Sequence, residues 1–255
     1  MRTPVVTFAT EQGPLIYQED FATYFHFQNP SMRGWLLAVM DGHRGRAVAE
    51  FCANEIENLF TPDKPDSMED TLRNLIAKLN AKTSHFDAGS TISLACILES
   101  HRKVVVAVLG DSPVFVLDTN GVFHQSPEHN ARTNLGERRA AIKRGAVYEN
   151  GYLFFNDGDN GPQYGLQMSR ALGNAPLSRM LSREPEIYTI ENPKWVLVAS
   201  DGLIDPSHWN AEYLMSKFKA HAKYCATAKM LLEYAEKEGP RNDNTTALVW
   251  CREKR

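Results

Sequence analysis

The sequence predicts an α+β fold in which antiparallel sheets are covered by helices. Three observations support this prediction: short β-rich runs recur along the chain, turn residues separate neighbouring runs, and amphipathic helical patterns come in pairs instead of alternating with single strands. With 255 residues and 43% hydrophobic composition, the chain is long enough to bury a sizeable core. We expect one domain over residues 1–255.

Seven runs rich in Val, Ile, Leu, Phe and Trp are predicted strands. Turn chemistry bounds them, as in the DTNG segment at 118–121, where Asn and Gly adopt the backbone conformations that a tight reversal requires. The predicted strands are 5–8, 35–40, 91–98, 104–109, 114–117, 195–199 and 246–250.

Helices are predicted where apolar residues recur every three or four positions. The first begins at Arg46 and ends at about residue 60, before the prolines at 62 and 65. A second begins at Asp66 or Ser67, either of which can cap it, while an acid three residues later completes a capping box. Residues 211–238 carry further helical pattern near the C-terminus.

Residues 130–162 break this pattern and are predicted to form a flap-like excursion. They contain a short basic helix at 136–144, stopped by Gly145, and then the turn-rich loop NDGDNGP at 156–162. The basic side chains could recruit an acidic or multiply phosphorylated partner, or they could be an ordinary solvated helix face.

Charge and cysteine usage exclude several classes of protein. A net charge of -3, with both signs mixed along the chain, argues against a nucleic-acid partner. The N-terminal segment is too short and too polar for a signal peptide, and no run is long enough to span a membrane. The four cysteines lack CxxC spacing, which disfavours a zinc site or a disulfide framework and favours a reducing compartment. We expect a cytoplasmic monomer without membrane attachment.

Carboxylates stand at the ends of several predicted strands. Each one alone is most simply a turn former or a helix cap. If strands of a common core deliver them to one edge, they repel one another unless cations lie between them. Oxygen ligands without cysteine and with few histidines favour Mg²⁺ or Mn²⁺ over zinc. These acids are Glu19, Asp20, Asp41, Asp111, Asp201 and Asp243.

Eight short motifs follow one another along nearly the whole chain. They are ED at 19–20, VMDGH at 39–43, GST at 89–91, LGDS at 109–112, EH at 128–129, SRALG at 169–173, ASDG at 199–202 and DNTT at 243–246. In this order they resemble the metal-dependent protein phosphatase 2C (PPM) family of Ser/Thr phosphatases. The resemblance implies two antiparallel β-sheets in a sandwich flanked by pairs of helices, with a two-metal centre at one end.

The resemblance also implies an activity. Asp41 would bridge two ions, Mg²⁺ or Mn²⁺, and Asp201 and Asp243 match further ligands of one of them. A water shared by two dications has a lowered pKa, so hydroxide is available near neutral pH. The implied reaction is hydrolysis of phosphoserine and phosphothreonine by this hydroxide. A phosphoprotein would be the substrate, and a Ser/Thr kinase is a further candidate partner.

Other positions match the family's secondary ligands and its acid. The Gly42 carbonyl would bind the second ion, on which Glu19 and Asp20 would act largely through bound waters. Asp111, together with Asp201, matches the position of a third and weaker ion. His43 follows in the same DGH motif and is the candidate general acid for the alkoxide leaving group, because imidazole can carry an available proton near pH 7.

Four positions depart from the family's pattern. Members commonly carry a phosphate-binding arginine where this chain has Leu15. Arg44 stands at a usual glycine, and it could partly replace that arginine or point to solvent. Pro113 and Asn174 replace the Arg of GDSR and the Asp of SRALGD. The absent arginine leaves open a pseudophosphatase that binds phosphoproteins without turnover, and the same acids would suit a two-metal hydrolase of other phosphate esters.

Overall fold

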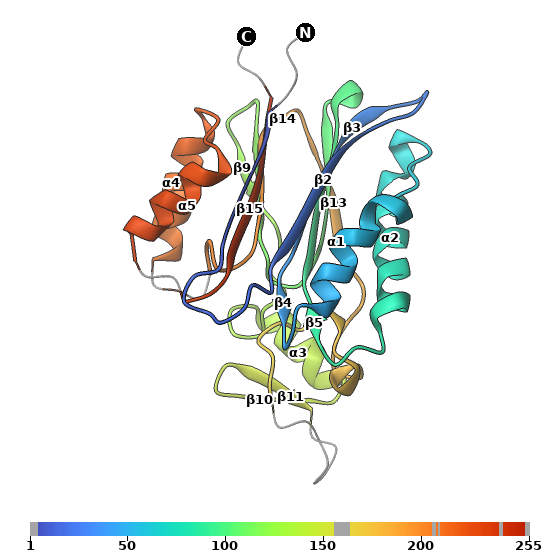
Figure 1. Ribbon diagram of the computed structural model, residues 1–255, viewed down its shortest axis with the longest axis vertical. Helices are drawn as coiled ribbons and strands as arrows, with labels where there is room; N and C mark the ends of the chain where they lie inside the picture. Colours follow the sequence, from blue (N-terminus) through green and yellow to red (C-terminus); the bar gives the residue numbers. More distant parts are fainter. Residues whose placement is uncertain (1–4, 156–163, 206–207, 209, 240–241, 253–255) are drawn as a thin grey trace.

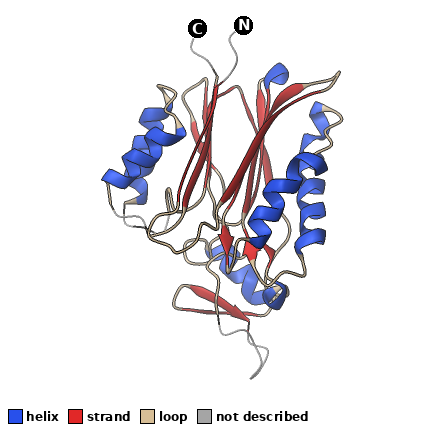
Figure 2. Cartoon of the chain, viewed as in Figure 1, coloured by secondary structure: helices blue, strands red, loops and turns tan. Residues whose placement is uncertain are grey.

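Two five-stranded antiparallel sheets lie face to face, and a pair of helices covers the outer face of each (Figure 1). The computed structural model describes residues 5–155, 164–205, 208, 210–239 and 242–252. The layers run helix, sheet, sheet, helix across the molecule (Figure 2). The predicted α+β class and the sandwich flanked by helix pairs are therefore confirmed.

The strand order differs from the chain order in both sheets. The first sheet runs β1 (Val5–Glu11), β15 (Thr245–Cys251), β14 (Pro193–Ala199), β8 (Val114–Asp118), β9 (Phe123–Gln125). The second runs β13 (Glu186–Glu191), β7 (Lys103–Leu109), β6 (Ile92–Leu98), β3 (Arg33–Met40), β2 (Phe21–Gln28). All seven predicted strands are present. Within these two sheets the sequence prediction missed the edge strands β2, β9 and β13, many of whose side chains are only partly buried.

The core strands bury both of their faces. Along β3, Leu37 and Val39 pack between the sheets, while Leu36, Ala38 and Met40 pack towards the helices. Successive side chains of a strand point to opposite faces, so a strand between two apolar layers becomes apolar throughout. The continuous hydrophobic runs of the sequence reflect this double burial.

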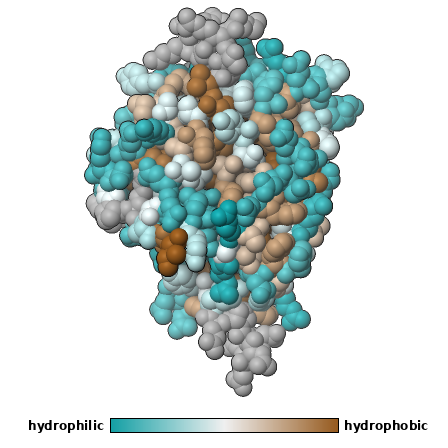
Figure 3. All heavy atoms as spheres, viewed as in Figure 1, coloured by the Kyte–Doolittle hydropathy of each residue, from teal (hydrophilic) through white to brown (hydrophobic). Residues whose placement is uncertain are grey.

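The helix pairs flank the sandwich. On the second sheet lie α1 (Ala47–Leu59) and α2 (Met68–Thr83), and on the first lie α4 (Ala211–Ala222) and α5 (Ala228–Lys237). Short 3₁₀ turns are Pro65–Ser67, Glu99–His101 and Ala175–Leu177. The predicted capping box of α2 is wrong, because a 3₁₀ turn precedes the helix and the Ser67 hydroxyl donates to the Lys64 carbonyl instead. Figure 3 shows polar residues over the helix layers and apolar residues between them.

A smaller unit lies at one end of the sandwich. The predicted basic helix is α3 (Leu135–Lys143), and a hairpin of β10 (Ala146–Glu149) and β11 (Tyr152–Phe155) follows it. Next to this unit, a short sheet joins β4 (Gly42–His43), β5 (Gly89–Ser90) and β12 (Leu172–Gly173). The turn-rich loop predicted at 156–162 lies outside the described residues.

The cysteine prediction needs one correction. Cys225 and Cys251 form a disulfide, whereas Cys52 and Cys96 are buried free thiols. The disulfide joins the turn before α5 to the end of β15, across 26 residues of sequence. This proximity is a property of the tertiary fold, which no local spacing motif encodes. Among the described residues, no helix has the length and apolar character needed to cross a membrane.

Candidate metal centre

Carboxyl groups from both sheets meet at the end of the sandwich where β3 and β14 stop. Asp41 follows β3, Asp201 follows β14, and the two carboxyl groups share a hydrogen bond. Burial, and next the charge of Asp201, raises the pKa of Asp41 well above its ordinary value. Asp20, Asp243 and Asp111 add to the repulsion on Asp41. Such a cluster of mutually repelling acids is stabilised when cations lie between its members.

Asp20 and Asp111 are the most buried of these acids. Burial raises the pKa of Asp20 to about 7, although the Ser200 hydroxyl donates to its Oδ2 at 2.7 Å and opposes the rise. Burial likewise raises the pKa of Asp111 to about 6 against a 2.8 Å hydrogen bond from Asn130 Nδ2 to its Oδ2. The other oxygen, Asp111 Oδ1, is buried and has no hydrogen-bond partner among the residues that the structure describes. A buried acceptor left open in this way suits a cation.

Close backbone contacts hold the Glu19 loop against the DGH motif. The Gly42 amide donates to the Glu19 carbonyl at 3.2 Å, and a Cβ on Gly42 would lie only 2.4 Å from that oxygen. The Gly45 amide donates to Glu19 Oε1 at 2.6 Å. On the other side of the loop, the Glu19 amide donates to Asn244 Oδ1 at 2.7 Å. Position 42 therefore requires glycine, and Glu19 is held at the rim of the acid cluster.

His43 lies partly buried beside the acid cluster. Its Nε2 is 2.9 Å from Asn174 Oδ1, and its Nδ1 is buried with no hydrogen-bond partner in the described part of the chain. Burial lowers the pKa of His43 to about 4, and the charges of Arg44 and Arg183 lower it further, against the hydrogen bond that Asn174 Oδ1 accepts from the ring. The imidazole is therefore neutral at pH 7 in this structure. Its predicted general-acid role requires a bound phosphate ester to raise that pKa, and the role stays a prediction.

The departures at positions 15 and 44 have distinct structural outcomes. Leu15 is 38% exposed in the loop before the ED motif, so this position supplies no guanidinium. Arg44 has a left-handed backbone, with φ of 60°, which costs a residue other than glycine about 1–2 kcal/mol. Its side chain is exposed, and its guanidinium carbon lies 3.4 Å from the ring centroid of Tyr164.

Two further acids belong to this cluster but were not predicted as ligands. Burial is the largest cause of the raised pKa of Asp111, Asp201 and Asp243. The charge of Asp205 raises each of these pKa values further. Burial raises the pKa of Glu128 to about 7, and Asp111 adds to that rise. Asp205 stands four residues after Asp201 and before a proline, a context that resembles an ordinary turn. A cavity of about 140 Å³ adjoins this side of the cluster, and its polar lining includes Asp201, Asp205, His208, Asn242 and Asp243.

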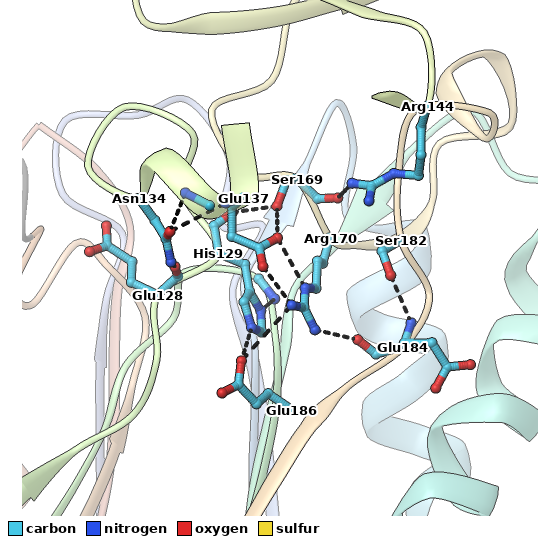
Figure 4. Close-up of polar contacts among 12 residues, drawn as sticks. Glu128, His129, Asn134, Glu137, Arg144, Ser169, Arg170, Ser182, Glu184 and Glu186 are labelled. Atoms are coloured by element: carbon cyan, nitrogen blue, oxygen red, sulfur yellow. Dashed lines mark hydrogen bonds and ion pairs between the residues drawn. The ribbon is translucent and has the colours of Figure 1, made fainter. Parts of the chain in front are cut away.

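A polar network around Glu137 anchors α3 to Ser169 and Arg170 (Figure 4). His129 is fully buried, and its Nδ1 accepts from the Gly110 amide at 3.1 Å. Its Nε2 lies 3.3 Å from Glu186. Arg170 pairs with Glu137 of α3 at 2.5 Å, and the Ser169 hydroxyl also donates to Glu137. The EH and SRALG motifs therefore have a structural role: they connect α3 to Gly110, the residue before Asp111.

The donor set fits Mg²⁺ or Mn²⁺ that keep part of their water shell. In the described parts of the chain, no three His, Cys, Asp or Glu side chains converge closely enough to hold an ion by themselves. Mg²⁺ retains several waters and is commonly held by only one or two carboxylates. Cys52 is unsuited to metal binding or catalysis because burial raises its pKa to about 12. The oxygen-rich cluster therefore fits hydrated hard dications.

Comparison with known proteins agrees with the geometry. The family model described as protein phosphatase 2C matches residues 15–209. Protein phosphatase fem-2 of Caenorhabditis elegans is 30% identical over 184 residues, which cover 67% of this chain and 40% of fem-2. Probable protein phosphatase 2C 58 of Arabidopsis thaliana is 29% identical over 229 residues, 84% of this chain and 76% of that protein. The chain thus spans less than half of fem-2.

Solved structures share the fold. A C. elegans sex-determining protein superposes with a TM-score of 0.76 at 24% identity, over 98% of this chain and 65% of its own. Serine-threonine phosphatase 2C from Toxoplasma gondii gives 0.71 at 19% identity, over 98% and 95% of the two chains. The family match covers most of the chain, and its motifs lie at the acid cluster. The chain belongs to the protein phosphatase 2C family.

Proposed function

We propose that the protein is a Mg²⁺- or Mn²⁺-dependent phosphatase that hydrolyses phosphoserine and phosphothreonine in proteins. One observation carries the proposal: Asp41 and Asp201, which follow strands of different sheets, share a hydrogen bond, and burial together with the neighbouring acids raises the pKa of both. When bound, two dications supply an activated water and neutralise phosphate charge. The residues that would hold these ions, and a weaker third, are Glu19, Asp20, Asp41, the Gly42 carbonyl, Asp111, Asp201 and Asp243.

The chain's own groups orient this centre. Ser200 donates to Oδ2 of Asp20, and Asn130 donates to Oδ2 of Asp111, whose Oδ1 has no hydrogen-bond partner among the described residues. Asn174 fixes the ring of His43 next to the cluster. His43 would give a proton to the departing serine or threonine oxygen once bound phosphate has raised its pKa. The positions and hydrogen bonds of these groups support hydrolysis by a bound water, a reaction that requires no covalent nucleophile.

The test combines metal binding with hydrolysis. Calorimetric titration with Mn²⁺ is expected to show binding that Asp41→Asn weakens about tenfold or more, because Asp41 would be a ligand of both ions. Hydrolysis of a phosphothreonine peptide should require Mn²⁺ or Mg²⁺, stop with EDTA and fall about 100- to 1,000-fold in Asp41→Asn, the range typical of lost electrostatic stabilisation. Asp66→Asn is the matched control, since Asp66 is exposed and pairs with Lys103 far from the centre. Activity that survives EDTA or Asp41→Asn contradicts the mechanism.

One observation favours a second candidate, a phosphoprotein-binding protein without turnover. The exposed Leu15 occupies the position of the family's phosphate-binding arginine. If metal binds but neither phosphopeptides nor other phosphate esters are hydrolysed, this pseudophosphatase role replaces the catalytic one. Hydrolysis of a phosphodiester in preference to a phosphopeptide would instead support a two-metal esterase.

A further inference from the structure

Arg44 occupies a strained backbone position directly after His43. Its φ of 60° is one that glycine adopts freely and other residues rarely adopt, and the family's motif has glycine there. A residue kept in an unfavourable conformation beside a functional site indicates that its side chain has a use. The backbone alone does not require arginine at this position.

The Arg44 guanidinium lies over the Tyr164 ring but retains its hydrogen-bonding capacity. It stacks on the Tyr164 ring at 3.4 Å, and within the described residues it forms neither a hydrogen bond nor an ion pair. The neighbouring arginines differ. Arg46 is paired with Glu50 at 2.9 Å, and Arg183 donates to the carbonyls of Ala171 and Gly173. A stacked guanidinium still presents its N–H edge, which matches two oxygens of a phosphate.

Arg44 follows His43 directly, so its backbone lies beside the acid cluster. Its charge acts on the neighbouring His43, and the next residue, Gly45, donates to Glu19 Oε1 at 2.6 Å. Asp87 lies close enough to act on Tyr164 but forms no ion pair with Arg44 among the described residues. A phosphate monoester approaching this acidic centre needs a cationic group that is not already neutralised, and Arg44 meets that need.

We propose that Arg44, oriented by Tyr164, binds the phosphoryl group of the substrate and replaces the arginine that is absent at Leu15. This proposal rests on the proposed function, because it assigns a substrate contact in the same site. Arg44 is the residue that would touch the phosphate, and Tyr164 is a positioning residue that acts through it. The assignment makes a phosphate monoester dianion the recognised group, independent of the peptide that carries it.

The test measures inorganic phosphate binding directly. Calorimetric titration of the Mg²⁺-loaded protein is expected to give a phosphate Kd about 10- to 100-fold higher in Arg44→Gly, which is the range for losing charge-assisted hydrogen bonds. Glycine accepts the φ at this position, so the melting temperature should stay the same or rise, which separates lost binding from lost folding. Arg46→Ala is the matched control, with an expected change below about twofold.

Tyr164 provides the second comparison. Tyr164→Phe keeps the ring face and should keep most of the phosphate affinity, whereas Tyr164→Leu should lose a large part of it. In steady-state assays, Arg44→Gly should raise both KM for a phosphothreonine peptide and the inhibition constant of phosphate, with a smaller effect on kcat.

The outcomes separate the two proposals. If the wild-type protein hydrolyses no phosphopeptide, the proposed function is contradicted. If Arg44→Gly nevertheless binds phosphate more weakly than wild type, the Arg44 assignment is supported. Phosphate affinity within twofold of wild type in Arg44→Gly overturns the assignment, whatever the activity. A wild-type protein that binds no phosphate at millimolar concentration also overturns it.

Discussion

Replacing Asp20 by Asn should stabilise the metal-free protein at alkaline pH. Asp20 is 5% exposed, and burial raises its pKa from 3.8 to about 7. At pH 8 the folded chain therefore keeps a charge in a site that disfavours it, and Asp243 and Glu19 repel that charge as well. Asparagine has the same shape without the charge, and its amide oxygen can still accept from Ser200.

The magnitude follows from the difference between the two pKa values. About three pH units at about 1.4 kcal/mol each correspond to about 4 kcal/mol, and altered hydrogen bonding reduces the expected gain to about 2–4 kcal/mol. The pH dependence has a definite sign. Between pH 4 and 7 the unfolded chain has already released the Asp20 proton that the folded chain still holds, so wild-type stability falls as pH rises. The gain from Asp20→Asn is therefore near zero at pH 4 and complete at pH 8.

Urea unfolding in EDTA at pH 4, 6 and 8 measures this dependence. Asp118→Asn is a control of opposite sign. Burial alone would raise the pKa of Asp118, but amide donation from Val122 and Asn120 lowers it, so its removal should destabilise the protein at pH 8. Equal stability of wild type and Asp20→Asn at pH 8, or an equal gain at pH 4 and pH 8, refutes the electrostatic reasoning. Saturating Mg²⁺ should stabilise wild type more than the variant.

Two further substitutions probe the supports of the centre. Gly42→Ala should weaken Mn²⁺ binding about tenfold or more in calorimetric titration, because a Cβ would lie 2.4 Å from the Glu19 carbonyl oxygen. Gly121→Ala is the control: the φ of Gly121 is 85°, but a Cβ there would meet no atom within 4 Å. It should leave Mn²⁺ binding unchanged and cost only about 1 kcal/mol of stability. Arg170→Ala should lower the free energy of unfolding by about 3 kcal/mol in urea melts, because it leaves Glu137 of α3 unpaired at a largely buried site. Lys229→Ala, which breaks an exposed pair, should change it by less than about 0.5 kcal/mol.

The interior strands were predictable because burial on both faces requires a continuous run of apolar residues. Residues 104–109 show this in β7, which lies between two other strands. The edge strand β2 mixes aromatic residues with exposed polar ones, so its pattern is weaker. The capping box of α2 failed for a different reason: a side chain that can cap a helix also finds partners in the turn before it, and Ser67 did so.

The acids were predictable as members of an ordered motif set, but their partners were not. Asp41 and Asp201 stand at strand ends, and their place in the motifs marks them as candidate ligands. Asp205 belongs to none of the motifs, because its place in the acid cluster depends on how the chain folds back after β14. The contact of Asn174 with His43 depends on the pairing of β4, β5 and β12, which join residues far apart in sequence.

The acid cluster spans the seam between two sheets that are packed together without shared strand pairing. Asp20 precedes β2 in the second sheet, and its carboxylate accepts from Ser200, which follows β14 in the first. The bond between Asp41 and Asp201 crosses the same seam. Repulsion among these acids therefore pushes apart the sheet ends that carry α3 and the DGH motif, while apolar packing holds the rest of the sandwich together. Ion binding at the seam would relieve this repulsion and should slow hydrogen exchange in β4 and β5 more than in the interior of β6.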